Sequence, residues 1–189
     1  MKENVKLIHS TLDGDELITY MARVSNPSGQ DKPPGKLIKY LIKHKHWSPF
    51  EMVNMCVQID TTRSVASQIL RHRSFSFQEF SQRYADVSQL GLPPIPNLRR
   101  QDLKNRQNSV DDLNQQSVEI WNRMIEDQFD KSQALYHLLL DNGVAKECAR
   151  DVLPLASPTR LYMNGTLRSW MHYCDLRCAN GTQLEHQHI

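Results

Sequence analysis

The strongest pattern in the chain is an alternation of apolar and polar residues over residues 52–60, MVNMCVQID. Successive side chains of a strand point to opposite faces, so this period of two predicts a half-buried strand. A shorter strand is predicted over residues 4–9, with Val5 and Leu7 on one face. The residues expected on the apolar face of the longer strand are Val53, Met55, Val57 and Ile59.

Apolar residues spaced three and four positions apart predict helices in most of the remaining chain. A run that begins at Gly35 cannot continue as a helix past Pro49, because proline lacks a backbone N–H. Residues 26–35 are dense in Pro and Gly and are expected to form a loop, a candidate flap. The other short helices are predicted at residues 15–24, 62–72, 144–152 and about 167–176.

One long helix is predicted between a capping box formed by Ser109 and Asp112 and a stop at Asn142 and Gly143. We expect it to be the main scaffold helix. Its apolar positions are Val118, Trp121, Ile125, Ser132, Leu135 and Leu139.

The last predicted helix has two distinct sides. One side is expected to face the core, and the other gathers polar side chains. The core-facing residues are Leu167, Trp170, Met171 and Cys174, and the polar ones are Arg168, His172 and Arg177.

The order of these elements favours an α+β fold over a doubly wound parallel sheet. We expect a central antiparallel sheet flanked by helices, including the long one. The length of 189 residues fits a single domain over residues 1–189.

Composition narrows the class of protein. Hydrophobic residues make up 39% of the chain and charged residues 23%, as in ordinary globular proteins. No apolar stretch approaches the length of a membrane span, and the first ten residues lack the apolar region of a signal peptide. The default expectation is a cytoplasmic protein that binds no membrane. Reduced thiols and no metal site are expected for the cysteines Cys56, Cys148, Cys174 and Cys178.

The net charge of +2 is small, but the arginines are clustered. Arginine carries a planar fork of donors that suits phosphate and carboxylate groups, so the clusters indicate polyanionic small molecules or nucleic acid. One cluster falls within 21 residues and the other within the last 40. They are Arg63, Arg71, Arg73 and Arg83, and Arg150, Arg160, Arg168 and Arg177.

The segment RHRSFSFQEFSQRY at residues 71–84 is the most informative for chemistry. Arg71, Arg73, Ser81 and Arg83 can surround a phosphate with charge-assisted hydrogen bonds. Glu79 could accept a hydrogen bond from a sugar or base, or form a structural ion pair. His72, on residue pattern alone, is a histidine on a helix surface.

Four further segments accompany this one: ARVS at 22–25, HKHWSPFE at 44–51, CARDVLP at 148–154 and LRSWMHYCDLR at 167–177. In order and approximate spacing, the five segments resemble the flavin-dependent thymidylate synthases over nearly the whole chain. Members of that family carry out the reductive methylation of dUMP to dTMP with FAD, methylenetetrahydrofolate as one-carbon donor and NADPH as reductant. The resemblance also implies a homotetramer that shares its sites between subunits.

The resemblance assigns residues to both ligands. It makes Arg177 catalytic, because the family places this arginine against the uracil ring, where a fixed cation can stabilise developing negative charge. For dUMP it implies Gln68, Arg71, Glu79, Ser81, Arg83, Arg150 and Arg177. For FAD it implies Ser25, His46, Ser48, Glu51, Arg71, His72, Arg73, Arg168, His172 and Leu176.

The chain departs from the family pattern at three places. Thr166 stands where an asparagine is common, and Gly181 where many relatives carry a histidine that meets the flavin. Relatives also continue beyond the position of Ile189 with another helix, so the resemblance implies a short C-terminus.

Two other readings of the residues are open. A single-stranded nucleic-acid-binding module would track phosphates with arginines and stack bases on aromatic residues. A His-rich metal protein would use clustered histidines, although His44 and His46 would not share a helical face. The stacking residues would be Phe75, Phe77, Phe80 and Tyr84, and the metal ligands His44, His46, His186 and His188.

Overall fold

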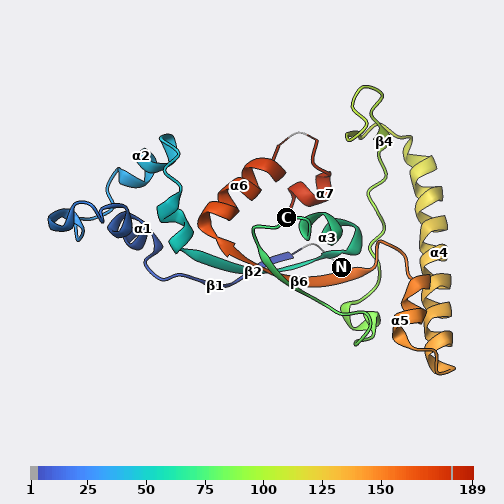
Figure 1. The fold of residues 1–189 in the computed structure, drawn as a ribbon. Helices are drawn as coiled ribbons and strands as arrows, with labels where there is room; N and C mark the ends of the chain where they lie inside the picture. The colour runs from blue at the N-terminus through green and yellow to red at the C-terminus, as the bar shows by residue number, and fades with distance from the viewer. Residues whose placement is uncertain (1–3, 180) are drawn as a thin grey trace.

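The computed structural model describes residues 4–179 and 181–189. Its main sheet has four antiparallel strands in the order β1-β2-β6-β3 (Figure 1). A two-stranded ribbon, β4-β5, lies apart from it. The predicted α+β class with an antiparallel sheet and flanking helices is confirmed. The strands are β1 (Asn4–Ser10), β2 (Asn54–Thr62), β3 (Ser76–Glu79), β4 (Arg100–Gln101), β5 (Ser109–Val110) and β6 (Pro158–Thr166).

Helices cover one face of this sheet and both of its ends. α3, α6 and α7 lie over the face, α1 and α2 lie at one end, and α4 and α5 lie at the other (Figure 1). The α-helices are α1 (Gly14–Ala22), α2 (Leu37–Lys43), α3 (Arg63–Ile69), α4 (Gln115–Asp141), α5 (Lys146–Ala149), α6 (Leu167–Arg177) and α7 (Leu184–Gln187). Short 3-10 turns are η1 (Pro27–Gly29), η2 (Ser48–Met52), η3 (Val87–Leu90) and η4 (Arg150–Val152).

The alternation in the central strand forms the core as predicted. Val57 and Ile59 of β2 are buried with Leu161 and Met163 of β6, beneath α3 and α6. The strand begins two residues later than expected because residues 48–52 form the turn η2.

The opposite face of β2 is polar. Asp60 accepts two hydrogen bonds from Arg160 of β6, at 2.5 and 3.0 Å, and Gln58 donates to the same carboxylate at 3.1 Å. This pairing explains why Asp60 can be buried although it carries charge.

The edge strand β1 was predicted correctly, but its side chains are exposed. Val5 and Leu7 do not reach the core. The core cluster beneath α3 and α6 is built on β2 and β6 and includes no residue of β1.

Two boundaries near the arginine segment differ from expectation. Helix α3 starts after Thr62, whose side chain accepts from the Val65 N–H at 3.5 Å, and ends at Ile69, so Arg71 and His72 lie beyond it. Strand β3 was not predicted. It joins the sheet against β6, where Gly165 leaves space for the ring of Phe75 that a β-carbon would fill.

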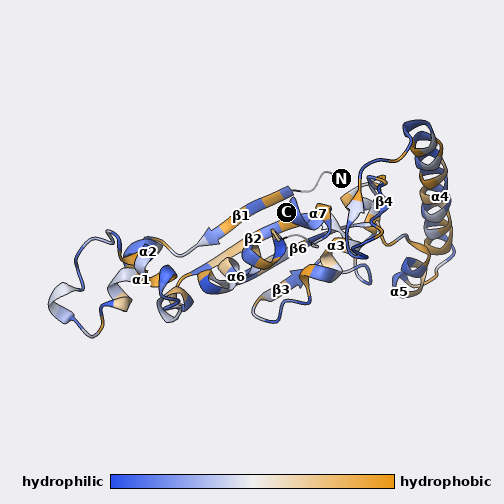
Figure 2. Ribbon diagram, turned by 90° about the horizontal axis from the view of Figure 1, so that it is seen from above, coloured by the Kyte–Doolittle hydropathy of each residue, from blue (hydrophilic) through white to orange (hydrophobic). Residues whose placement is uncertain are grey.

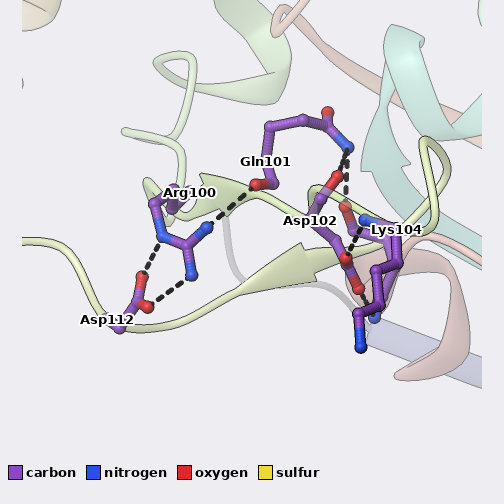
Figure 3. Close-up of polar contacts among 6 residues, drawn as sticks. Arg100, Gln101, Asp102, Lys104 and Asp112 are labelled. Atoms are coloured by element: carbon purple, nitrogen blue, oxygen red, sulfur yellow. Dashed lines mark hydrogen bonds and ion pairs between the residues drawn. The ribbon is translucent and has the colours of Figure 1, made fainter.

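The predicted capping box is wrong. Ser109 lies in strand β5, and the carboxylate of Asp112 accepts two hydrogen bonds from Arg100, at 2.8 and 2.6 Å (Figure 3). This bidentate pair lowers the pKa of Asp112. Helix α4 begins instead after Asn114, whose side chain accepts from the Ser117 N–H at 3.1 Å.

The long helix is present and, as predicted, stops before Gly143. This glycine has a φ of +80°. It does not lie on the sheet, however. It stands at the end of the molecule, where α5 and η4 contact it (Figure 2). Only Ser132 and Tyr136 of α4 are buried, while a set of large apolar side chains is exposed. These are Ile120, Trp121, Met124, Leu135 and Leu138.

Helix α6 packs on the sheet with one change from the predicted face. Trp170 is buried and donates to the Met55 carbonyl at 3.0 Å, but Tyr173 rather than Cys174 is the second buried residue. Across residues 4–179 and 181–189, none of the helices is long and apolar enough to cross a membrane.

Candidate functional site

A pocket of about 370 Å³ lies where α3 and α6 end. Gln68, Arg71 and Arg177 line it together, although Gln68 and Arg177 are far apart in the sequence. Its other lining residues are Gln107, Gly181, Thr182 and Gln183. Three of the seven residues predicted to bind the nucleotide are thus brought into one cavity.

Arg177 is held in this pocket by His72. The Arg177 Nε donates to His72 Nε2 at 2.8 Å, so that ring nitrogen must carry a lone pair. Burial, and then the charge of Arg177, lower the pKa of His72. The imidazole also lies edge-on against the ring of Tyr173, with centroids 4.7 Å apart. A neutral histidine therefore orients the guanidinium without neutralising it.

The polar side of α6 forms a stripe that leads away from this pocket. Arg168, His172 and Leu176 are spaced four residues apart, which places them on one face over about 12 Å. Arg168 donates to Glu51 at 2.6 Å, and the His172 ring lies 5.0 Å from that of Trp47. The stripe connects the η2 turn to the Arg177 pocket.

The remaining residues predicted to bind flavin lie mostly beyond the η2 end of the stripe. Ser48 lines a cavity of about 310 Å³ with Val24, the neighbour of the exposed Ser25. His46 follows α2, and its ring lies 6.1 Å from that of Tyr40. Arg73 is exposed in the turn between α3 and β3, next to Arg71 and His72.

Ser81 and Arg83 lie in a different pocket, of about 330 Å³, with Lys146 and Glu147 of α5. Glu147 connects the two arginine clusters: its carboxylate lies 3.2 Å from Arg83, and its carbonyl accepts from Arg150 at 3.3 Å. This pocket shares no lining residue with the Arg177 pocket. The predicted nucleotide residues therefore fall into two groups within one chain.

Glu79 belongs to neither group. Its carboxylate accepts from Arg63 and, at 2.9 Å, from the hydroxyl of Thr159. The structural ion pair, one of the two roles considered for this residue, is thus present, and its partner is Arg63.

A buried network that no sequence pattern indicated lies behind the Arg177 pocket. His186 is 2% exposed and contacts Tyr173 and Gln68, while Gln68 also donates to Gln183 at 2.6 Å. Gln68 and His186 are 118 positions apart, so no local pattern relates them. Sequence reasoning considered His186 only as a metal ligand.

Two of the aromatic residues proposed as a stacking platform are unsuited to it. Phe75 and Phe77 are partly buried and pack against the core under α6. Over the described residues, no cluster of three His, Cys, Asp or Glu side chains could hold a metal ion.

Comparison with known proteins decides the family. The family model described as Thymidylate synthase complementing protein matches residues 6–189. This chain belongs to that family. A probable flavin-dependent thymidylate synthase of Paramecium bursaria Chlorella virus 1 is 52% identical over 174 residues, which cover 91% of this chain and 80% of the viral protein. The flavin-dependent thymidylate synthase of Synechocystis sp. (strain ATCC 27184 / PCC 6803 / Kazusa) is 47% identical over 188 residues, covering 100% and 86%.

A solved structure agrees with the family assignment. The UMP/dUMP methylase PolB from Streptomyces cacaoi, bound with 5-Br dUMP, superposes with a TM-score of 0.83 at 27% identity. The match covers 99% of this chain and 86% of PolB.

Two of the three departures from the family pattern, Thr166 and Gly181, occupy defined places. Thr166 caps α6 by accepting from the Ser169 N–H at 3.2 Å, and it donates to Glu51 at 3.1 Å. Gly181 lies in the wall of the Arg177 pocket with a φ of +97°, a conformation that favours glycine. A side chain at this position would strain the backbone.

Lowering the pH from about 6.5 toward about 4 is expected to destabilise the protein through His186. Burial, with the charges of Arg177 and His72, lowers the pKa of His186 from 6.5 to about 4. Between these values the unfolded chain binds a proton that the folded chain does not, so stability is complete above pH 6.5 and lost as the pH falls. The loss is roughly 3 kcal/mol in the free energy of unfolding.

Urea unfolding at several pH values measures this loss. His186→Leu should show a weaker pH dependence than the wild type, whereas His188→Leu, which changes an exposed histidine of the same segment, should keep it. An unchanged pH dependence in His186→Leu would contradict the assignment.

Proposed function

We propose that this protein is a thymidylate synthase that reductively methylates dUMP to dTMP, with FAD as cofactor, methylenetetrahydrofolate as one-carbon donor and NADPH as reductant. The observation that carries the proposal is the pocket in which Gln68, Arg71 and Arg177 converge, in a chain of this family. The names of its relatives and the brominated dUMP bound to PolB support the same substrate.

The nucleotide would occupy a site made by two subunits. One half-site would consist of Gln68, Arg71 and Arg177, and the other of Ser81, Arg83 and Arg150. Glu79 would join the second half-site if its side chain rotated or if it exchanged its Arg63 partner. In one chain the halves lie in separate pockets. A homotetramer that brings one half of each chain against the other half of a neighbour would complete four sites.

The exposed apolar side chains of α4 support such an assembly. Large unpartnered apolar surfaces on a helix mark contacts with other chains. Residues such as Trp121, Met124 and Leu138 would be buried between subunits.

Arg177 would be the catalytic residue, because its guanidinium is fixed by His72 and lines the nucleotide pocket. A preorganised cation stabilises negative charge that develops on a uracil carbonyl when a nucleophile adds to the ring. Cys174, the thiol of α6, is poorly suited as that nucleophile, because partial desolvation and then the neighbouring Cys178 raise its pKa and so disfavour the reactive thiolate. The protein would thus bind and orient the nucleotide and the flavin, and the bound flavin would supply the reducing electrons.

The α6 stripe fits an elongated, anionic, partly aromatic ligand. Arg168 offers a cation for phosphates, His172 and Trp47 offer ring surfaces, and Leu176 offers an apolar contact next to the Arg177 pocket. FAD would be held along this stripe by Arg168, His172, Leu176 and Glu51, with His72, Arg71 and Arg73 at one end and Ser25, His46 and Ser48 at the other.

The absorption spectrum of the purified protein tests the proposal directly. We expect an oxidised-flavin spectrum, present on purification or after reconstitution with FAD, that bleaches with NADPH and changes on addition of dUMP. Formation of dTMP from dUMP and methylenetetrahydrofolate would complete the test. A protein that stays colourless with FAD and instead binds single-stranded DNA would refute it.

Two substitutions should separate substrate chemistry from cofactor binding. Arg177→Ala should retain FAD but lose methylation by at least about a hundredfold, because a transition-state contact is removed. His46→Ala should loosen FAD binding, because His46 belongs to the HKHWSPFE segment that the resemblance assigns to the flavin. Flavin content and dTMP formation are measured for both, with Arg177→Lys as the control that keeps the charge but loses the planar fork. Substantial turnover in Arg177→Ala, or unchanged flavin content in His46→Ala, would overturn the respective assignment.

Mixed tetramers test whether the two half-sites belong to one site. Arg177→Ala and Arg83→Ala chains are each expected to be inactive, but together they should regain activity, since about a quarter of randomly assembled sites would combine two intact halves. Co-expression with two different affinity tags isolates the mixtures.

The matched control combines Arg177→Ala with Gln68→Leu. Both changes fall in the same half-site, so no mixture restores a complete site. A mixture of Arg177→Ala and Arg83→Ala that is as inactive as this control would show that the halves are not shared.

A further inference from the structure

We propose that His186 is a positioning residue that fixes the side-chain amide of Gln68 for nucleotide binding. The inference rests on the proposed function, because it concerns the pocket assigned to dUMP. His186 does not line that pocket. It lies behind it, on α7, and acts through Gln68.

The contacts form a chain of four side chains. The Tyr173 hydroxyl lies 2.7 Å from His186 Nε2, and His186 Nδ1 lies 3.4 Å from Gln68 Oε1. The Gln68 Nε2 then donates to Gln183 Oε1 at 2.6 Å. This series of contacts runs from the buried face of α6, through α7, to the pocket wall.

The chemistry of these atoms determines which is the donor and which the acceptor in each hydrogen bond. Gln68 Oε1 carries only lone pairs, so the facing Nδ1 of His186 must carry the hydrogen. The Nε2 of a neutral imidazole then has a lone pair, which accepts a hydrogen bond from the Tyr173 hydroxyl. Burial favours both forms, since it lowers the pKa of His186 to about 4 and raises the pKa of Tyr173 to about 12.

This order of donors and acceptors fixes which edge of Gln68 faces the pocket. Reversing the amide would place its NH₂ group against the N–H of His186. To avoid this, His186 would have to change tautomer, and the Tyr173 hydroxyl would lose the acceptor for its proton. One N–H of Gln68 and the second lone pair of its oxygen therefore remain for a nucleotide, in one orientation.

Helix α7 is anchored firmly enough to act as a support. Glu185 forms an ion pair with Arg99 at 2.7 Å, in which both side chains are largely buried. Ile189 packs against the core of the sheet. His186 thus reaches Gln68 from a fixed position.

Binding of dUMP to the FAD-loaded protein tests the proposal, measured by the change in the flavin spectrum. His186→Leu should bind dUMP about tenfold more weakly, the effect of losing one buried hydrogen bond. The KM for dUMP should rise more than kcat falls, because a binding contact is lost. His186→Asn should restore most of the affinity, because its Nδ2 takes the place of the imidazole Nδ1. His188→Leu, in the same segment, should bind as the wild type does.

A double-mutant cycle identifies the route. In a Gln68→Leu background, His186→Leu should weaken dUMP binding no further, because the side chain through which His186 acts is already gone. Tyr173→Phe should weaken binding in the wild-type background and not in the Gln68→Leu background. If His186→Leu does not fold, Tyr173→Phe and His186→Asn carry the same cycle.

The outcomes separate this proposal from the proposed function. Wild-type affinity in His186→Leu, or an equal loss in both backgrounds, would overturn the positioning role while the synthase assignment stands. A wild-type protein that binds FAD but not dUMP would overturn the proposed function and the positioning role with it.

Discussion

The packing of α6 on the β2-β6 pair is the interaction on which the rest of the structure depends. Trp170 and Tyr173 are buried against the apolar face of these strands, and the indole N–H donates to the backbone of β2. This contact leaves the opposite side of α6 free for the stripe and aims Arg177 past the end of the helix. Because the same Tyr173 contacts both His72 and His186, core packing and pocket geometry are determined together.

The two half-sites of the proposed function would explain how so small a chain could serve several large ligands. The Arg177 pocket contains only three of the seven residues assigned to the nucleotide, so the other contacts would have to come from another surface. Ser81, Arg83 and Arg150 would supply these contacts, but within one chain they lie around Glu147, away from the Arg177 pocket. Division of the site between subunits would make assembly and activity inseparable.

Elements that are determined by a local sequence pattern could be predicted from the sequence. The alternation in β2 identified the apolar face, and Gly143 marked the end of α4. The predictions were wrong where a residue distant in the sequence determines the conformation or burial of a side chain. The carboxylate of Asp112 is satisfied by Arg100 across a ribbon, so it caps no helix. Tyr173, rather than Cys174, joins the core cluster, with its ring against those of His72 and His186. The resemblance to the family predicted that Gln68, Arg71 and Arg177 bind the same ligand. The contact of His186 with Gln68 could be found only from the three-dimensional structure.

The use of histidine around Arg177 has an electrostatic reason. A carboxylate would hold the guanidinium more strongly, but it would also neutralise the charge on which the proposed chemistry relies. Over the described residues, the ion pairs of this protein do not include Arg177. A neutral imidazole offers a hydrogen bond and no charge, and the burial of His72 keeps it in that form. The Arg177 cation is therefore oriented by His72, and its charge would stay available to the proposed nucleotide.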